Sequence, residues 1–301
     1  MTQSRDVRGQ VFFSQPEGQE LAAISRDGTL ERWNRQGQRL PPLWQASSGE
    51  WAIGLDLRQG RSHLATLVTT GKDQGQVTVW SIEKDRPQHP QSFSLGSHNP
   101  RWAVAEFSPN GRYLAVGFRD GDAYLIDRQP LLGVFNRKPI PLKPKPPSPV
   151  QTAISSLRFS PDGQTLAVAG RDGTLRLWTL QGRERLPQPI NHGSPITSVR
   201  FNQPRSRREP LLLVTLSWNQ RVRLWDSRGN PVAEFRGETG FWDAGFSPEG
   251  DLLAVGSEGK GQWLPVKSLD QLVKQGCDWI ADYRRTHPKA TQDLQFCDDL
   301  R

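Results

Sequence analysis

Arginines recur beside the same kind of turn in four parts of the sequence. Arg26, Arg119 and Arg171 each stand directly before an Asp-Gly pair, and Arg221 follows Asn219 by two positions. A guanidinium carries several N–H donors in one plane and pairs well with carboxylates and phosphates. If the fold brings these turns together, the arginines form a basic surface that suits an acidic protein or another polyanion.

A proline-rich basic stretch adds Lys143 and Lys145 to these candidates. It reads RKPIPLKPKPPSPV at residues 137–150, and its prolines favour a semi-rigid extended chain. The formal net charge of +8 and the pI near 9.9 are compatible with an anionic partner. The charges are scattered along the chain, so an ordinary solvated surface also explains them.

No residue pattern predicts catalysis. HExxH, GxSxG, GxxxxGK[ST] and CxxC are all missing from the sequence. The two cysteines, Cys277 and Cys297, lie in the last 25 residues and are expected to be buried small apolar side chains, with a redox pair as the alternative. We therefore expect a chain that is not an enzyme and uses no metal or cofactor. The five histidines stand in unrelated contexts: His63, His89, His98, His192 and His287.

The elements that must position the arginines repeat along the chain. Four segments place an Asp or Asn six residues before an apolar anchor, as in GRDGTLRLW at residues 170–178, and GQVTVW at residues 75–80 is a looser copy. A sixth copy, LLAVGSEGKGQWLPV, covers residues 252–266. Such a period predicts repeated supersecondary units that stack on one another. The anchors of the first five copies are Trp33, Trp80, Ile126, Trp178 and Trp225.

A Ser-Pro-acid/amide-Gly turn precedes several of these anchors. It occurs in FSPNGRYLAVG (residues 107–117), FSPDGQTLAVAG (159–170) and FSPEGDLLAVG (246–256). Proline fixes φ, the Asp or Asn bonds local backbone, and glycine accepts positive φ. Each unit is therefore predicted to be four antiparallel strands joined by tight turns, with no long helices.

These turns and anchors resemble the WD-repeat family over about residues 10–266. The resemblance implies an all-β propeller of six four-stranded blades over residues 1–267, with Ser4–Gly9 lending a strand to the last blade. A seven-bladed ring with one blade upstream is the alternative. An open ring would leave unpaired strand edges, which favour aggregation.

The family resemblance also implies structural roles and a binding face. His192, Ser217, Asn219 and Trp225 are expected to form the hydrogen-bonded tetrad of the fifth blade. The face that carries the Asp-Gly turns commonly binds partners, and it would hold Arg26, Arg119, Arg171, Arg221, Lys143 and Lys145. The other residues expected to stiffen the blades are Ser25, Asp27, Trp33, Trp80, Asp120, Asp172, Trp178 and Asp226.

The period changes to that of a helix after residue 267. Leu269, Leu272, Val273, Ile280 and Tyr283 fall on one face of a helix predicted over Ser268–His287, which Pro288 ends. We expect residues 268–301 to form a helical tail packed on the propeller. This tail resembles the one that ends many WD-repeat proteins of cyanobacterial multidomain signalling systems.

The sequence therefore predicts a non-catalytic scaffold or sensor/regulatory module of a bacterial signalling system, with a protein as partner. Binding of nucleic acid or another polyanion through the basic face is the alternative. The start of the chain lacks a secretory h-region, and no stretch approaches the length of a membrane span, so we expect a cytoplasmic protein without a membrane partner. A monomer, or one component of a larger complex, is expected.

Overall fold

The described part of the chain forms β-strands and no helix. The computed structural model describes residues 7–13, 20–25, 29–45, 50–56, 62–70, 74–83, 86–96, 103–128, 138–144, 152–204, 209–236, 241–247, 252–257 and 260–266. These residues form six antiparallel sheets, which we number in chain order. The tail predicted over residues 268–301 lies outside the described residues.

The first three sheets each contain four consecutive strands that are paired in chain order. Sheet 1 consists of β1 (Val7–Phe13), β2 (Glu20–Ser25), β3 (Leu30–Asn34) and β4 (Arg39–Trp44). Sheet 2 consists of β5 (Glu50–Asp56), β6 (Ser62–Thr70), β7 (Gln74–Glu83) and β8 (Arg86–Gly96). Sheet 3 consists of β9 (Val104–Phe107), β10 (Tyr113–Gly117), β11 (Ala123–Asp127) and β12 (Ile140–Pro141).

The next two sheets repeat this order, and the sixth sheet has three strands. Sheet 4 consists of β13 (Ile154–Phe159), β14 (Thr165–Gly170), β15 (Thr174–Thr179) and β16 (Ile190–Asn191). Sheet 5 consists of β17 (Ile196–Phe201), β18 (Leu212–Ser217), β19 (Arg221–Asp226) and β20 (Pro231–Arg236). Sheet 6 consists of β21 (Phe241–Phe246), β22 (Leu252–Ser257) and β23 (Lys260–Pro265).

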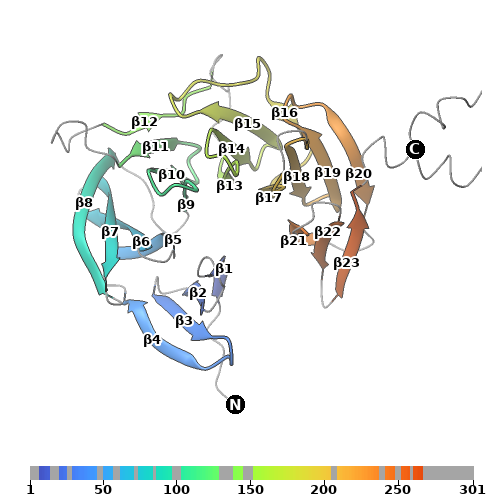
Figure 1. Ribbon diagram of the computed structural model, residues 1–301. Helices are drawn as coiled ribbons and strands as arrows, with labels where there is room; N and C mark the ends of the chain where they lie inside the picture. The colour runs from blue at the N-terminus through green and yellow to red at the C-terminus, as the bar shows by residue number, and fades with distance from the viewer. Residues whose placement is uncertain are drawn as a thin grey trace, which may run out of the picture.

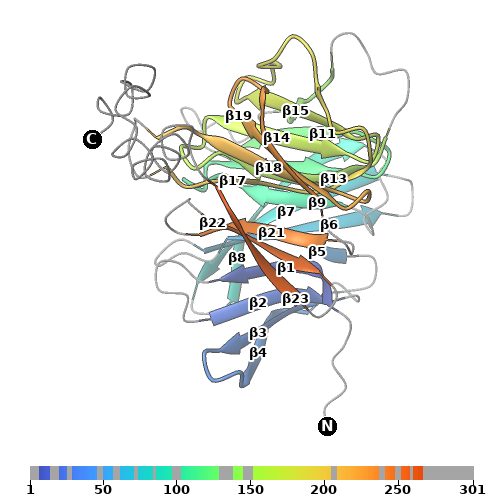
Figure 2. The same cartoon turned by 90° about the vertical axis from the view of Figure 1, so that its right-hand side faces the viewer.

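The sheets follow one another around a common centre (Figure 1). The first strand of each sheet lies innermost, and the last strand lies on the outside. Seen from the side, the strands of different sheets are tilted relative to one another (Figure 2). The all-β prediction is confirmed, whereas the number of blades in the complete ring stays a prediction.

The closing strand expected from Ser4–Gly9 is not formed by the described part of that segment. Val7–Gly9 belong to β1, where Val7 pairs with Ser25 of β2. The chain thus uses these residues as the innermost strand of sheet 1. Sheet 6 consequently has three strands among the described residues, rather than the four expected.

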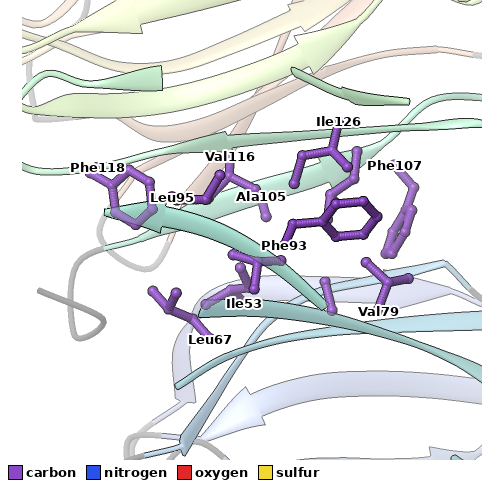
Figure 3. Close-up of a cluster of buried hydrophobic side chains, with 13 residues drawn as sticks. Ile53, Leu67, Val79, Phe93, Leu95, Ala105, Phe107, Val116, Phe118 and Ile126 are labelled. Carbon is purple, nitrogen blue, oxygen red and sulfur yellow. The ribbon is translucent and has the colours of Figure 1, made fainter. Parts of the chain in front are cut away.

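The hydrophobic core lies between neighbouring sheets. In the cluster between sheets 2 and 3, Ile53, Val79 and Phe93 meet Phe107 and Ile126 (Figure 3). Similar clusters separate sheets 1 and 2, 3 and 4, 4 and 5, and 5 and 6. Inner strands are therefore buried on both faces, which explains why β14 and β18 are buried at every position.

The predicted anchors occupy matching places on the third strands. Trp33, Trp80, Ile126, Trp178 and Trp225 pair with Leu21, Leu64, Leu114, Leu166 and Leu213 of the second strands. Trp178 and Trp225 are 2% and 6% exposed, and Ile126 is fully buried. The repeat predicted from the sequence is thus a repeat of strand register.

The Ser-Pro turns connect the first and second strands of sheets 3 and 4. The Ser160 hydroxyl donates to the Asp162 carboxylate and accepts the Thr165 N–H at 2.9 Å. Gly163 takes a φ of +68°. Ser108, Asn110 and Gly111 build the same turn in sheet 3. This network fixes the register of each first hairpin, as the sequence predicted.

Candidate interaction face

The turns between second and third strands lie at one end of each sheet, beside the loops that lead into the next sheet. We call this end of sheets 3–5 the turn face; it consists of residues 118–122, 170–174 and 217–221 with the loop 191–195. The Arg171 N–H donates to the Ala153 carbonyl at 2.9 Å, and the Trp218 N–H donates to the Pro195 carbonyl at 3.1 Å. Each of these two turns is therefore held by the loop that leads into the first strand of its own sheet.

Equivalent positions on the turn face carry Arg119, Arg171 and Trp218. Each stands five residues after the leucine that pairs with the third-strand anchor of its sheet. All three side chains are exposed, and Trp218 is 63% exposed. The sequence interpretation selected the two arginines and missed Trp218, although Trp218 stands directly before the turn residue Asn219, as the arginines do before their Asp residues.

Arg171 and Trp218 form a contact across the boundary between sheets 4 and 5. The Arg171 guanidinium carbon lies 5.5 Å from the centroid of the Trp218 ring, within the range of a cation–π interaction. The neighbouring Asp172 carboxylate accepts the Thr174 N–H at 2.9 Å and its hydroxyl at 2.8 Å, so it is occupied within its own turn. The pair presents a cation and a large apolar surface side by side to solvent.

Arg221 shares one acidic partner with two other arginines of sheet 5. Its guanidinium lies 3.1 Å from Glu234, which also pairs with Arg223 at 2.7 Å and with Arg236 at 3.3 Å. The hydrogen bond from Arg223, with that from Arg236, lowers the pKa of Glu234. The role of Arg221 in binding a partner stays a prediction.

Two of the remaining basic candidates lie in the described residues, and two do not. Arg119 precedes a turn in which the Asp120 carboxylate accepts the Asp122 N–H at 3.1 Å. Lys143 is exposed, and it follows Leu142, whose N–H donates to the Ala123 carbonyl at 2.8 Å. Ala123 opens β11 at the turn-face end of sheet 3, so Lys143 lies at that end as well. Arg26 and Lys145 lie outside the described residues, as does Asp27.

The tetrad predicted in sheet 5 is formed in part. His192 is 1% exposed and packs edge-on against Trp225, with ring centroids 6.4 Å apart. Ser217 donates to the Asn219 side chain within the turn. The Trp225 indole N–H, however, donates to Thr215 at 2.8 Å rather than to Ser217. Thr215 therefore takes the second-strand position that the sequence interpretation gave to Ser217.

A threonine hydroxyl also accepts the indole N–H in sheet 2, but not in sheet 4. The Trp80 indole N–H donates to Thr66 at 3.1 Å. In sheet 4 the position equivalent to Thr215 is Val168, and the Trp178 indole nitrogen has no hydrogen-bond partner. Comparing the second strands two residues after the paired leucine would have shown this difference in the sequence.

The other residues with predicted structural roles lie on the strands and turns. The Asp226 carboxylate accepts the backbone N–H groups of Arg228 and Asn230 at 2.9 and 2.8 Å, in the turn from β19 to β20. Burial opposes its ionisation, but the hydrogen bonds from Asn230 and Arg228 lower its pKa overall. Trp33 is partly buried on β3, and Ser25 ends β2.

A buried basic residue marks the opposite end of sheet 3. Arg128 donates to the Gly111 carbonyl at 2.5 Å, and its guanidinium carbon lies 5.4 Å from the centroid of Phe107. Burial lowers the pKa of Arg128 to about 10, although Asp56 opposes this.

Among the described residues no group of three His, Cys, Asp or Glu side chains is arranged to hold a metal ion. No helix in that part of the chain is long and apolar enough to cross a membrane.

Three segments match the family model described as WD domain, G-beta repeat: residues 90–127, 148–179 and 186–226. Together they contain parts of sheets 2–5, including all three turns of the turn face. Each segment begins before the innermost strand of its sheet (3, 4 or 5) and ends with the third strand. The first and third segments also include residues of the last strand of the preceding sheet.

Several curated proteins are similar to parts of the chain. The COMPASS component SWD1 of Saccharomyces cerevisiae is 27% identical over 150 residues, which cover 48% of this chain and 32% of that protein. The WD40 repeat protein poxJ of Penicillium oxalicum is 38% identical over 123 residues, 40% of this chain and 35% of that one. The WD repeat-containing protein RUP2 of Arabidopsis thaliana is 29% identical over 247 residues, 77% of this chain and 58% of RUP2. The chain thus spans about a third of the first two relatives and more than half of the third.

A solved structure has the same fold. A chain of the mitotic checkpoint complex superposes with a TM-score of 0.62 and 15% identity, covering 86% of this chain and 74% of its own. At that identity the likeness concerns the fold alone, and it agrees with the ring of sheets described above. Residues 90–127, 148–179 and 186–226 of this chain thus match the WD40 repeat, and the fold that contains them resembles a β-propeller.

Proposed function

We propose that this chain is a non-catalytic interaction module that binds a protein partner through the turn face, with Arg171 and Trp218 at the centre of the contact. The observation that carries the proposal is the exposed indole of Trp218 beneath the Arg171 guanidinium. Tryptophan and arginine are enriched among the residues that dominate binding energy at protein interfaces. An exposed tryptophan on a turn held by backbone hydrogen bonds offers much apolar area at small entropic cost.

The partner surface is expected to combine a carboxylate with an adjacent apolar side chain. Arg171 has no acidic partner among the described residues, while Arg119 and Lys143 add positive charge on the preceding sheet, sheet 3. A carboxylate would pair with the guanidinium, and the apolar group would cover the indole. Desolvating the ring strengthens a cation–π interaction at the same time.

Affinity capture with matched variants tests this function. Immobilised full-length chain is compared with Arg171→Ala and Trp218→Ala in lysate of the source cells. Arg183→Ala and Val232→Ala serve as controls, because Arg183 is an exposed arginine on the β15–β16 turn and Val232 is an exposed apolar residue on β20. We expect a saturable protein to be lost in the first two variants and kept in the controls. The same proteins bound by all five chains would contradict the proposal.

Binding of nucleic acid remains the second candidate, because the net charge is +8 and the exposed turn residues include Arg119 and Arg171. A polyanion that contacts several cations loses affinity steeply as salt increases. If the captured species is nucleic acid, and it is released between about 50 and 200 mM salt, as counterion release predicts, the second function replaces the first.

We place this module in a cytoplasmic bacterial signalling system, as a sensor or regulatory component. The support is the resemblance of residues 268–301 to the tail of cyanobacterial multidomain signalling proteins, together with the complex components among the WD40 relatives. The chain is proposed to act as a monomer or as one component of a larger complex. Mass spectrometry of the captured partner tests this placement, since a signalling kinase, protease or NTPase is expected.

A further inference from the structure

One position on the third strand of sheets 2–5 packs against the following sheet. Val79, Leu125, Leu177 and Leu224 occupy this position, each directly before the anchor residue of its strand. Their side chains are between 0% and 3% exposed, and they belong to the clusters shared with sheets 3, 4, 5 and 6 respectively. The exposed fraction of the side chain at this position therefore shows whether the following sheet covers that face of the sheet.

Trp263 occupies this position in sheet 6 and is 65% exposed. The register defines the equivalence, because Trp263 pairs with Ala254 as Leu177 pairs with Ala167. The neighbouring Leu264 and Val266 pack against the cluster between sheets 5 and 6. Trp263 therefore lies on the opposite face of sheet 6, turned away from sheet 5. We call this face, which Trp263 marks, the Trp263 face.

β23 is also the outermost strand of sheet 6 in the described residues, where the preceding sheets carry a fourth strand. A tryptophan buries roughly 150–250 Å² when it is covered, so leaving it in water forgoes hydrophobic stabilisation. The chain supplies one segment of suitable character at this point. Residues 267–301 begin directly after Val266, and they carry the apolar positions Leu269, Leu272, Val273, Ile280 and Tyr283 at helical spacing.

The lengths of the two elements match. A helix over the predicted range Ser268–His287 spans about 30 Å at 1.5 Å per residue. β23 has six residues and is about 20 Å long at 3.3 Å per residue. A chain that turns back at Lys267 can thus lay the apolar face of this helix along the whole strand. The helix needs such a surface, because an isolated helix of this length is only marginally stable in water.

We propose that Ser268–His287 docks as an amphipathic helix on the Trp263 face and takes the place that the next sheet takes elsewhere in the ring. The helix contributes Leu272 and Ile280 to the contact with Trp263, and its polar side remains in solvent. Two other occupants are conceivable on geometry: sheet 1, which follows next around the ring (Figure 1), and a second copy of the chain. The experiment below separates them.

Photo-crosslinking of the full-length chain tests the docking. Trp263 is replaced by p-benzoyl-phenylalanine, equal amounts of isotope-labelled and unlabelled chain are mixed, and the crosslinked peptides are mapped by mass spectrometry after irradiation. We expect crosslinks from position 263 to residues 269–283 within the same chain. The same photoreactive residue placed at Val232, which is 49% exposed on β20, is expected to give no crosslink to these residues.

Two matched variants identify the face of the helix. Leu272→Glu is expected to lower the crosslink yield about tenfold or more, because an ionised carboxylate is strongly disfavoured against apolar surface. Gln271→Glu changes the charge by the same amount on the other side of the predicted helix and is expected to leave the yield unchanged. Melting curves confirm that both variants are folded.

Crosslinks to β1–β4, crosslinks between labelled and unlabelled chains, or no crosslinked peptide at all would each overturn the proposal. So would a yield that Leu272→Glu does not lower. None of these results depends on the turn face, so the docking and the proposed partner binding succeed or fail separately.

Discussion

At the scale of single residues, the buried tryptophans differ in what their indole nitrogens bind. Trp225 donates to Thr215 and Trp80 donates to Thr66, whereas Trp178 faces Val168 and has no partner. Because Trp178 is 2% exposed, water does not readily take the role of the missing acceptor. A buried donor without a partner costs about 1–3 kcal/mol.

Val168→Thr is therefore expected to stabilise the protein by about 0.5–1.5 kcal/mol, through a new hydrogen bond from Trp178. The reverse substitution, Thr215→Val, should cost about 1–3 kcal/mol, because it leaves the Trp225 indole unpaired. Chemical denaturation of the two variants measures both effects. A loss of stability in Val168→Thr would show that the threonine hydroxyl itself finds no acceptor in sheet 4.

His192 makes folding sensitive to acid. Burial lowers its pKa below the ordinary value of 6.5, and the nearby charge of Arg223 adds to this, while Glu234 opposes it. The unfolded chain therefore binds a proton at a higher pH than the folded one. The stabilisation is fully present above about pH 6.5 and is lost as the pH falls towards the folded-state pKa.

We expect the melting temperature of the wild-type chain to fall between about pH 7 and pH 5, and part of this fall to vanish in His192→Gln. The variant removes the titrating group, while Glu234 and the other acids titrate as before. Differential scanning fluorimetry across this pH range makes the comparison. Identical pH profiles for the two chains would contradict the assignment of a buried neutral imidazole.

At the scale of elements, the turn between β14 and β15 couples sheet 4 to the loop that precedes β17. Gly173 has a φ of +83°, and a Cβ placed on it would lie 2.8 Å from the Ser194 carbonyl oxygen. The His192 N–H donates to the Gly173 carbonyl at 2.8 Å from the other side. The loop that supports Trp218 through Pro195 is thus packed on a turn that has no room for a side chain.

Gly173→Ala is expected to destabilise the protein by more than the 1–2 kcal/mol that a left-handed backbone costs an alanine. Gly37→Ala is the matched control, since Gly37 has a φ of +75° and no atom within 4 Å of the added Cβ. We also expect Gly173→Ala, but not Gly37→Ala, to weaken capture of the partner by displacing the loop under Trp218. Equal losses of stability would mean that the loop yields freely.

Local patterns in the sequence predicted most of these elements. The third-strand anchors, the Ser-Pro turns and the Asp-Gly turns all depend on residues a few positions apart, and the structure has them where they were expected. Contacts between distant positions were not predictable in this way. Glu234 comes opposite Arg223 and within reach of Arg221 only once β19 and β20 pair, and Thr215 is identified only through the register of β18 and β19.

At the scale of the whole molecule, sheets 2–5 are covered by neighbouring sheets on both faces, whereas sheet 6 is not. Sheet 4 contacts the clusters shared with sheets 3 and 5, whereas sheet 6 shares a cluster with sheet 5 and exposes Trp263 on its other face. In such arrays stability depends on the interfaces between neighbours.

Hydrogen exchange should therefore differ along the ring. We expect the amides of β14 to exchange by global unfolding and those of β22 to exchange faster, by local opening of sheet 6. Mass spectrometry of peptides that cover residues 165–170 and 252–257 measures the difference. Equal protection of the two strands would indicate that the ring unfolds as one cooperative unit.

The exposed residues of the turn face are mounted on a rigid frame. The backbones of the Arg171 and Trp218 turns are held by the loops that lead into the first strands of their own sheets, and packed side chains fix the positions of neighbouring sheets. The spacing between Arg119, Arg171 and Trp218 is therefore set by the core rather than by the side chains themselves. The turn face consequently holds its exposed side chains at fixed distances from one another. If a partner binds there as proposed, it is expected to be selected by the distance between its contact groups as well as by its charge, and a core substitution far from the face is expected to change which partner fits.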